Sequence, residues 1–432
     1  EETGFLQQTD RIVWGPWLVF LLLGCGCYLV IRLVFLPLRN LLAALGLVFH
    51  PKSRKGTDGE GVSSFSALTT ELAATIGTGN IVGVATAMVL GGPGALFWLW
   101  VAALLAMVIK MTEVTLAVYY REKQPNGEYL GGPTYYMQKG LGGEKKLPFW
   151  KIFAVLFGGC IFMTWFITLQ NYTVSEAVGS TFKLPYIVPS LLYVLAIYVI
   201  IIGGVKKVGV ISSYMTPVMC LLYIVGSLFI LITNYERLPE AFVLIFKGAF
   251  TTQAAVGGFL GAGVATAMRL GFARSVYSNE AGWGTSPMIH ASAKTDHPVK
   301  QGLMGAFEVF ADTIVVCSMT GLVVIVTGYW NSGLQGSELT LTAVESESVQ
   351  NRRKNIYSRN TIMGTSGYRT DTLRKRNSGT ALGYCRLYDG IPDICKRSNI
   401  IYLKRNLYQT VKRLQGTLPW YWKSRRRYGS FL

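Results

Sequence analysis

Long runs of residues without a charged side chain constrain this chain more than any other feature of its sequence. Such runs lie between Arg11 and Arg32, Lys151 and Glu176, Lys183 and Lys206, Lys207 and Glu236, and Asp312 and Glu338. About 20 consecutive apolar residues in a helix cross the hydrocarbon core of a bilayer. Only 15% of the residues are charged, whereas a soluble domain carries about 25%. The sequence therefore predicts an all-α polytopic membrane protein.

The uncharged stretch from residue 72 to 109 is too long for a single crossing, and Gly91-Gly92-Pro93-Gly94 divides it with a tight turn. With this division, residues 1–344 form a transmembrane domain with about eight expected spans, at residues 12–32, 67–90, 94–120, 152–176, 184–205, 208–233, 256–292 (broken) and 301–330. Basic residues are concentrated in every second loop between the expected spans. Because cytoplasmic loops carry an excess of Lys and Arg, we expect the N-terminus outside the cell inner membrane.

Two of the expected spans carry polar, glycine-rich segments. The second contains Thr75-Ile76-Gly77-Thr78-Gly79-Asn80, and the seventh contains Ser278-Asn279-Glu280-Ala281-Gly282-Trp283-Gly284. Irregular backbone at membrane depth survives only where it lines a cavity or is buried in protein. We therefore predict two helices broken near the midplane and running in opposite directions, the inverted-repeat arrangement of many secondary transporters. The alternative is that these glycines serve close helix packing.

Broken helices offer a defined chemistry for binding. One half begins with unpaired N–H groups, which suit a carboxylate, and the other ends with carbonyl groups, which suit Na⁺. Thr78 and Asn80 add hard side-chain oxygens. The second break supplies Ser278, Asn279 and Trp283. A small zwitterionic amino acid fits this set, with Trp283 as a wall.

Acidic residues inside the spans are candidates for a cation site, because intramembrane charges are functional by default. We expect Asp312, Asn80 and Thr75 to bind the cation. Glu308, four residues before Asp312, is either functional or solvated near the cytoplasmic end. Glu280 either acts in the site or pairs with Arg274 or Arg269.

Other classes of function find little support. The segment from Gly77 lacks the preceding strand and the glycine spacing of a nucleotide-binding turn, and no Walker loop is present. No nucleophile, base and orienting group occur together, so we predict a protein that is not an enzyme. None of the seven cysteines forms a CxxC pair, so we expect no cofactor and no metal other than sodium.

Three segments carry a family resemblance. They are SALTTELAATIGTGNIVGVATAMVLGGPGALFWLW, FARSVYSNEAGWGTSPMIHASAKTDHPVKQG and the shorter GGPTYYMQKGLG. They resemble the signature segments of the alanine or glycine:cation symporter family (sodium:alanine symporters), and the similarity runs from about Trp14 to about Thr342. The resemblance implies symport of alanine or glycine with sodium, sometimes with protons. It also implies a five-plus-five inverted-repeat fold with one extra N-terminal helix.

Carried onto this chain, the resemblance implies that the substrate contacts residues from three helices: Thr78, Gly79 and Asn80, then Gln170, then Asn279, Gly282 and Trp283. Asn80 also matches a Gly-x-Gly-Asn pattern in which the asparagine binds the cation. From its residues alone, Gln170 could equally hydrogen-bond a neighbouring helix. The expected function is a sodium-coupled symporter of a small neutral amino acid. The alternative is a non-transporting amino-acid sensor or an inactive truncated carrier.

The last part of the chain departs from the family pattern. Residues 345–432 contain 19 Lys and Arg against 5 Asp and Glu and no apolar run long enough to span. The second repeat is therefore predicted to be incomplete. A shifted reading frame is the leading explanation for this tail, and a basic extension that binds anionic lipid or nucleic acid is the second. The expected partners are a small amino acid, sodium and the bilayer, with no nucleic acid and a monomeric state.

Overall fold

The computed structural model describes residues 16–54, 62–125, 127–164, 169–251, 263–332, 334, 339–340 and 342–344. Within these ranges the chain is mostly helical, as predicted, and its strands are two-residue segments. The predictions made for residues 345–432 lie outside the described residues.

The first half of the described chain runs from an N-terminal helix to a helix that ends at Phe182. Its helices are α2 (Pro16–Arg32), α3 (Leu36–Arg39), α4 (Leu41–Phe49), α5 (Pro51–Arg54), α6 (Ser64–Thr75), η1 (Gly79–Gly83), α7 (Val84–Gly91), α8 (Gly94–Tyr120), α9 (Pro133–Tyr136), η2 (Met137–Glu144), α10 (Trp150–Thr164) and α11 (Leu169–Phe182). The second half contains α12 (Ile187–Ile201), α13 (Gly204–Thr233), η3 (Tyr235–Arg237), α14 (Leu238–Phe250), α15 (Val264–Asn279), α16 (Thr285–Ala291), α17 (Pro298–Val309), η4 (Phe310–Cys317), α18 (Ser318–Val326) and η5 (Tyr329–Asn331).

Three helices of the described chain are long and apolar enough to cross a bilayer: α8, Lys206–Thr233 of α13, and the continuous helix Pro298–Val326. A fourth crossing results if α6 and Gly79–Gly91 count as one span bent by 49°. Shorter apolar helices cover Leu23–Arg32, Trp150–Met163 and Ile187–Ile201. These segments fall on predicted spans, and the full count of eight spans stays a prediction.

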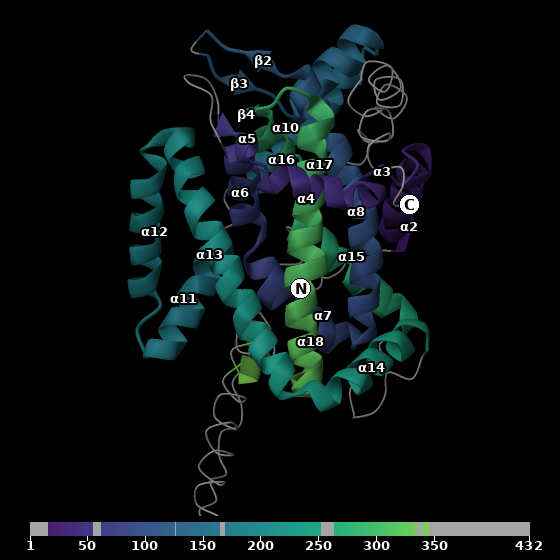
Figure 1. Cartoon of the computed structure of the whole chain (residues 1–432), viewed down its shortest axis with the longest axis vertical. Helices are drawn as coiled ribbons and strands as arrows, with labels where there is room; N and C mark the ends of the chain where they lie inside the picture. The colour runs from purple at the N-terminus through teal and green to yellow at the C-terminus, as the bar shows by residue number, and fades with distance from the viewer. Residues whose placement is uncertain are drawn as a thin grey trace, which may run out of the picture.

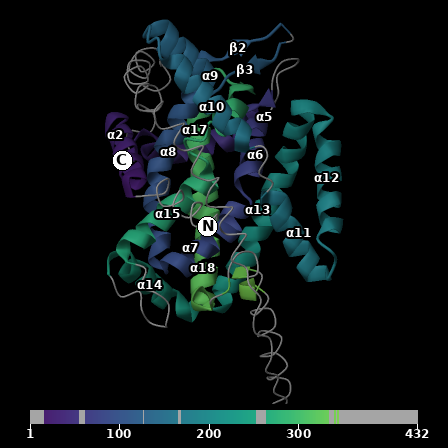
Figure 2. The same ribbon diagram turned by 180° about the vertical axis from the view of Figure 1, so that it is seen from behind.

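Helix α8 packs against α2, α14, α15, α16 and α17, while α11, α12 and α13 lie along the opposite side of the molecule (Figures 1 and 2). The most apolar 18-residue window is 67% buried in α8 but only 22% buried in α13. Leu191 and Leu192 of α12 are likewise more than 60% exposed. Apolar side chains exposed along a helix are those expected to face lipid, since a helix buried in protein covers them.

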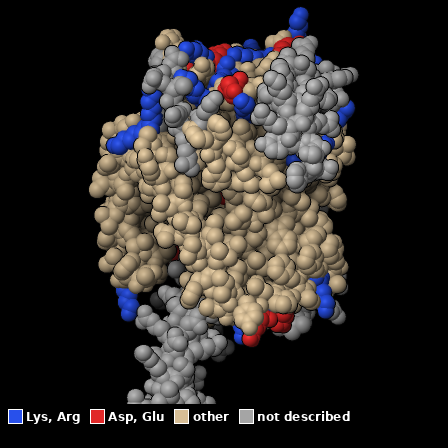
Figure 3. Space-filling model, viewed as in Figure 1, with Lys and Arg blue, Asp and Glu red and all other residues tan. Residues whose placement is uncertain are grey.

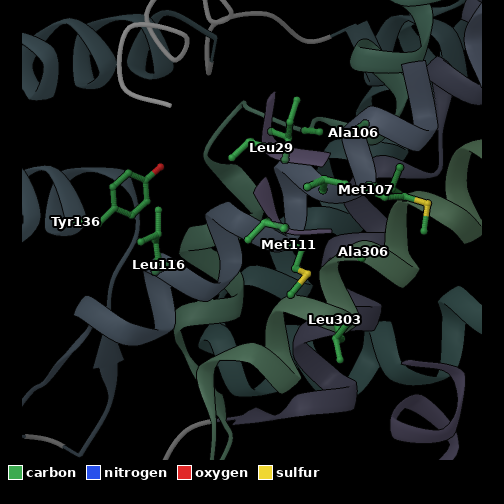
Figure 4. Close-up of a cluster of buried hydrophobic side chains, with 14 of the residues drawn as sticks. Leu29, Ala106, Met107, Met111, Leu116, Tyr136, Leu303 and Ala306 are labelled. Atoms are coloured by element: carbon green, nitrogen blue, oxygen red, sulfur yellow. The ribbon is translucent and has the colours of Figure 1, made fainter. Parts of the chain in front are cut away.

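A cluster of buried apolar side chains joins α8 to its neighbours (Figure 4). Met107 and Met111 of α8 lie with Leu29 of α2 and Leu303 of α17, and all four are at most 7% exposed. Close packing of this kind, rather than water exclusion, holds helices together inside a bilayer. The cluster fixes α17 against α8, and these two helices carry Glu308 and Lys110.

A short parallel pairing connects the ends of two helices that are far apart in sequence. Strand β1 (Val62–Ser63), before α6, pairs with β4 (Ala293–Lys294), after α16. The Ser64 hydroxyl also donates to the Lys294 carbonyl at 3.0 Å. The start of α6 therefore lies beside the end of α16 (Figure 1). As a result, the two helices that contain the glycine-rich segments run in opposite directions through the molecule.

Several elements have no counterpart among the predicted spans. Helices α3, α4 and α5 lie in the connection after α2, and α14 follows α13. In α14 the buried residues Ala241, Ile245 and Ala249 are spaced four apart, so one stripe faces the protein while Phe242 and Phe246 are exposed. Such an amphipathic segment is too short to span the bilayer, and it contains no long apolar run by which the sequence could predict it. A small antiparallel pair, β2 (Glu122–Lys123) with β3 (Tyr129–Leu130), follows α8.

Candidate cation and substrate site

The helix that begins with α6 is interrupted directly after Thr75. Ile76 has an extended conformation (φ −77°, ψ 99°), and the helix resumes at Gly79 after a bend of 49°. The backbone N–H of Gly77 donates to the side-chain oxygen of Asn80 at 2.9 Å. Asn80 thus satisfies a donor that the break leaves without a helical partner. Its amide nitrogen remains available for contacts with other helices.

The helix α15 is interrupted at Glu280, in the second segment that the sequence singled out. Glu280 has a left-handed conformation (φ 50°), and Gly282 and Gly284 follow with φ 86° and 81°. Glycine adopts this region without strain, which explains its presence at two of the three positions. The Glu280 carboxylate accepts a hydrogen bond from the Thr285 hydroxyl at 2.6 Å across the break. The chain is helical again from Thr285, where α16 starts.

Side chains from both interrupted helices meet at Asp312 of η4. We call Asn80, Ser278, Asp312, Thr313 and Cys317 the Asp312 cluster. Asn80 Nδ2 donates to Asp312 Oδ1 at 2.7 Å, and the Ser278 hydroxyl donates to Asp312 Oδ2 at 2.7 Å. The Thr313 hydroxyl also donates to Oδ2 at 2.7 Å. Cys317 Sγ lies 3.3 Å from Asn80 Nδ2 and 3.1 Å from Ser278 Oγ.

The Asp312 cluster is rich in oxygen and shielded from solvent. Asn80 and Asp312 have no exposed surface, and Ser278 is 1% exposed. The hydrogen bonds that Asp312 accepts come from neutral groups, and a buried carboxylate is costly unless its charge is compensated. Carboxylate and hydroxyl oxygens are ligands for a hard cation, whereas Asn80 presents its amide nitrogen to Asp312 and its oxygen to Gly77. Within the described residues, no group of three or more His, Cys, Asp or Glu side chains is placed to hold a metal ion.

A second set of buried polar groups surrounds Lys110 of α8. We call Glu71, Lys110, His290, Gln301 and Glu308 the Lys110 cluster; all five are 0% exposed. Lys110 Nζ lies 3.1 Å from Glu71 Oε1 and 2.9 Å from Glu308 Oε1. His290 Nε2 lies 3.3 Å from Glu308 Oε2, and Gln301 Nε2 lies 2.7 Å from His290 Nδ1. Glu308 is therefore not solvated, and that alternative from the sequence is wrong.

Asn279 connects the two clusters. Its carbonyl accepts a hydrogen bond from Lys110 Nζ at 2.7 Å. Its side-chain nitrogen donates to the Thr313 hydroxyl at 3.1 Å, and its side-chain oxygen accepts from the Ala281 N–H at 3.0 Å. The last residue of α15 is thus held from two sides by groups of α8 and η4.

The remaining residues predicted to bind ligands lie at different places. Gly79 contacts α15, since a Cβ at this position would lie 3.2 Å from Ser278 Cα. Trp283 is half-buried, and its ring packs against Tyr277 at a centroid distance of 6.3 Å. The Thr75 hydroxyl donates within α6 to the Glu71 carbonyl. Gln170 is exposed on α11, and no described contact joins it to either cluster. Thr78 lies at the bend, directly before Gly79.

Sequence reasoning missed Lys110, Glu71, Thr313 and Cys317 as members of these clusters. Lys110 ends an uncharged run, so the sequence alone marks it as the boundary of an apolar stretch. The rule that charges inside a spanning helix are functional could have found it, because α8 continues to Tyr120. No comparable signal marks Cys317 or Thr313, whose roles depend on which helix lies opposite.

Comparisons with known proteins agree with one another. Residues 2–356 match the sodium:alanine symporter family. An uncharacterized transporter of Haemophilus influenzae is 46% identical over 339 residues, which cover 78% of this chain and 72% of that protein. The sodium/alanine symporter AgcS of Methanococcus maripaludis is 42% identical over 325 residues (75% and 70%). The probable sodium/glutamine symporter GlnT of Bacillus subtilis is 37% identical over 338 residues (78% and 68%).

Proposed function

Because this chain belongs to the sodium:alanine symporter family, whose members are transporters and not enzymes, we propose that it couples sodium entry to the uptake of a small neutral amino acid such as alanine or glycine. It works by alternating access in the inner membrane, with its N-terminus outside. Membership of this family identifies the chain as an amino-acid:cation symporter. The choice of alanine or glycine and of sodium is the proposal.

One observation carries the proposal of a cation site: Asp312 is fully buried, and both interrupted helices contribute a hydrogen bond to its carboxylate. Asn80 comes from the first of these helices and Ser278 from the second. A sodium ion bound at Asp312 would supply the charge that its neutral partners lack, with oxygen ligands suited to a hard cation. Its binding would hold the two helices together, so ion occupancy and helix position are coupled.

The chemistry of helix ends supports a binding site for the amino acid in the same region. The helix that starts at Gly79 points the backbone N–H groups of its first turn toward the break. N–H groups at the start of a helix favour a substrate carboxylate. The carbonyl groups at the end of α6 favour the ammonium group, since the Asn279 carbonyl at the end of α15 already accepts a hydrogen bond from Lys110. Thr78, Asn279, Gly282 and Trp283 complete the proposed substrate site. Gln170 belongs to it only if α11 moves toward the interrupted helices during transport.

The test is uptake of labelled alanine by the full chain in proteoliposomes. We expect uptake under an inward sodium gradient and none when choline replaces sodium. Unlabelled glycine and glutamine, added in excess, report substrate preference, since one relative is named for glutamine. Uptake that is unchanged without sodium contradicts sodium coupling. Binding of alanine without any flux identifies the sensor or inactive carrier.

Asn80→Ala should abolish sodium-driven uptake, because it removes the amide that bonds both Gly77 and Asp312. Asn234→Ala is the matched control: Asn234 also uses its side-chain amide, but at the end of α13, where it donates to the Ile230 carbonyl. We expect uptake by the control to stay near that of the wild type. Full activity of Asn80→Ala would remove Asn80 from the cation site.

A further inference from the structure

The side chain of Lys110 is surrounded by three oxygen atoms inside the protein. Its Nζ lies 2.7 Å from the Asn279 carbonyl, 2.9 Å from Glu308 Oε1 and 3.1 Å from Glu71 Oε1. Lys110 donates hydrogen bonds to the Asn279 carbonyl and to Glu71 Oε1, and it forms an ion pair with Glu308. The three oxygens belong to three different helices, α15, α17 and α6, while Lys110 belongs to a fourth.

The Asn279 carbonyl is the significant partner for function. Asn279 is the last residue of α15, so its carbonyl is one of those that a helix end leaves without an intrahelical partner. The end of a helix also carries partial negative charge, which a cation stabilises. A positive charge at this point therefore holds the end of α15 in place at the break.

The position of Asn279 determines the geometry of the Asp312 cluster. The preceding residue, Ser278, donates to Asp312 Oδ2 at 2.7 Å, and Asn279 itself donates to Thr313. Glu308 and Asp312 lie about one turn apart on the helix formed by α17 and η4. Lys110 thus contacts both the residue beside Ser278 and the helix that carries Asp312, although it does not belong to the Asp312 cluster.

We infer that Lys110 is a positioning residue, a cation tethered to α8 that fixes the end of α15 and thereby sets the sodium affinity of the Asp312 cluster. The inference rests on the proposed function. The tethered charge holds α6, α15 and α17 in one arrangement while the transported ion binds and dissociates. Partners that orient the ligands of an ion typically change its affinity by about 10–100-fold when they are removed.

The charge of Lys110 has to be separated from the stability that its ion pairs provide. Lys110→Met alone leaves Glu71 without the partner described for it, and such a variant risks misfolding. The double variant Lys110→Met/Glu71→Gln removes one positive and one negative charge together. Glu308 then keeps His290 and Ser286 as neighbours at 3.3 Å. This variant removes the tethered cation without leaving its acidic partner on α6 ionised and alone.

The experiment measures the sodium concentration that half-saturates thermal stabilisation of the full chain in detergent, with choline chloride keeping the ionic strength constant. It does not depend on transport, so failure of the wild type to take up alanine leaves the result interpretable. For the double variant we expect a half-saturating concentration about 10–100-fold above that of the wild type. Lys110→Arg, which keeps a cation at this place, should fall between the two.

Lys139→Met is the control, because Lys139 also pairs with a glutamate, Glu122 at 3.0 Å, but at a partly exposed surface. Its sodium response should equal that of the wild type. A double variant that is folded and responds to sodium at the wild-type concentration overturns the inference, since Lys110 would then only balance charge.

Discussion

Gly79 sets how closely the two interrupted helices approach each other. A Cβ added there would lie 3.2 Å from both Ser278 Cα and Tyr277 Cδ1, tighter than ordinary contacts. Gly77, two residues earlier, has nothing within 4 Å of the same added atom. The two glycines of one segment therefore differ in function: Gly79 permits contact between helices, while Gly77 offers its N–H to Asn80.

This difference gives a matched pair of variants. Gly79→Ala should separate η1 from α15, and overpacking of this kind typically costs about 1–3 kcal/mol. Because the strain falls between Asn80 and Ser278, we expect sodium-driven alanine uptake to fall by at least about tenfold, which corresponds to about 1.4 kcal/mol. Gly77→Ala should retain most uptake. Equal loss in both variants would show that flexibility, and not the contact, requires glycine in this segment.

At the level of elements, the sequence predicts the features that depend on the composition of a single helix. It does not predict the features that depend on how two helices pack. The long runs predicted α8, α13 and the helix from α17 to α18, because a spanning helix needs an uninterrupted apolar length. Both polar, glycine-rich segments coincide with interruptions, and the second has a local reason as well, the positive φ of Gly282 and Gly284.

No comparable sequence signal marks the contacts between residues that lie far apart in the chain. Glu71 and Lys110 are 39 residues apart, and Asn80 and Asp312 are 232 residues apart. Which polar side chain lies opposite another depends on the rotation of each helix about its axis, and that rotation is fixed by packing. Asn80 and Asp312 could be nominated individually from their depth in the membrane. Their contact with Cys317, and the role of Lys110, became visible only once the helices were placed.

Helix α17 approaches α8 closely because Gly302 has no side chain. A Cβ at this position would lie 2.1 Å from Thr115 Oγ1 and 2.9 Å from the Met111 carbonyl. We expect Gly302→Ala to destabilise the protein by about 1–3 kcal/mol, as overpacking does. Gly226→Ala in α13, where nothing lies within 4 Å, should be neutral or stabilising by up to about 1 kcal/mol. Thermal unfolding in the same detergent compares them, and similar melting temperatures would contradict the packing argument.

At the scale of the whole molecule, the face shown in Figure 3 has its charged side chains at two ends and a broad uncharged band between them. One end carries β2, β3 and β4, and the opposite end carries α14 (Figure 1). A band without charges is what the hydrocarbon core requires of a protein surface, since ions at that depth are unfavourable. The segment 121–151 carries an excess of Lys and Arg, so by the positive-inside rule we propose that the first end faces the cytoplasm.

The proposed orientation predicts which residues an impermeant maleimide reaches in intact cells. Lys145 follows η2 at the proposed cytoplasmic end, Glu236 lies in η3 at the other, and both are exposed. In a variant without native cysteines, Glu236→Cys should react before permeabilisation and Lys145→Cys only after it. The reverse pattern would invert the proposed topology and place the N-terminus inside.

The ion pair between Glu71 and Lys110 joins two helical segments that enter the membrane one after the other during synthesis. Both have been translated well before the ribosome reaches Glu308. A lone Lys at the centre of a nascent helix opposes insertion by about 2.5–3.5 kcal/mol. Insertion of α6 to α8 as one hairpin, with the two opposite charges already matched, avoids that barrier. If this hairpin inserts first, the acid of α17 joins an ammonium group that is already paired with Glu71.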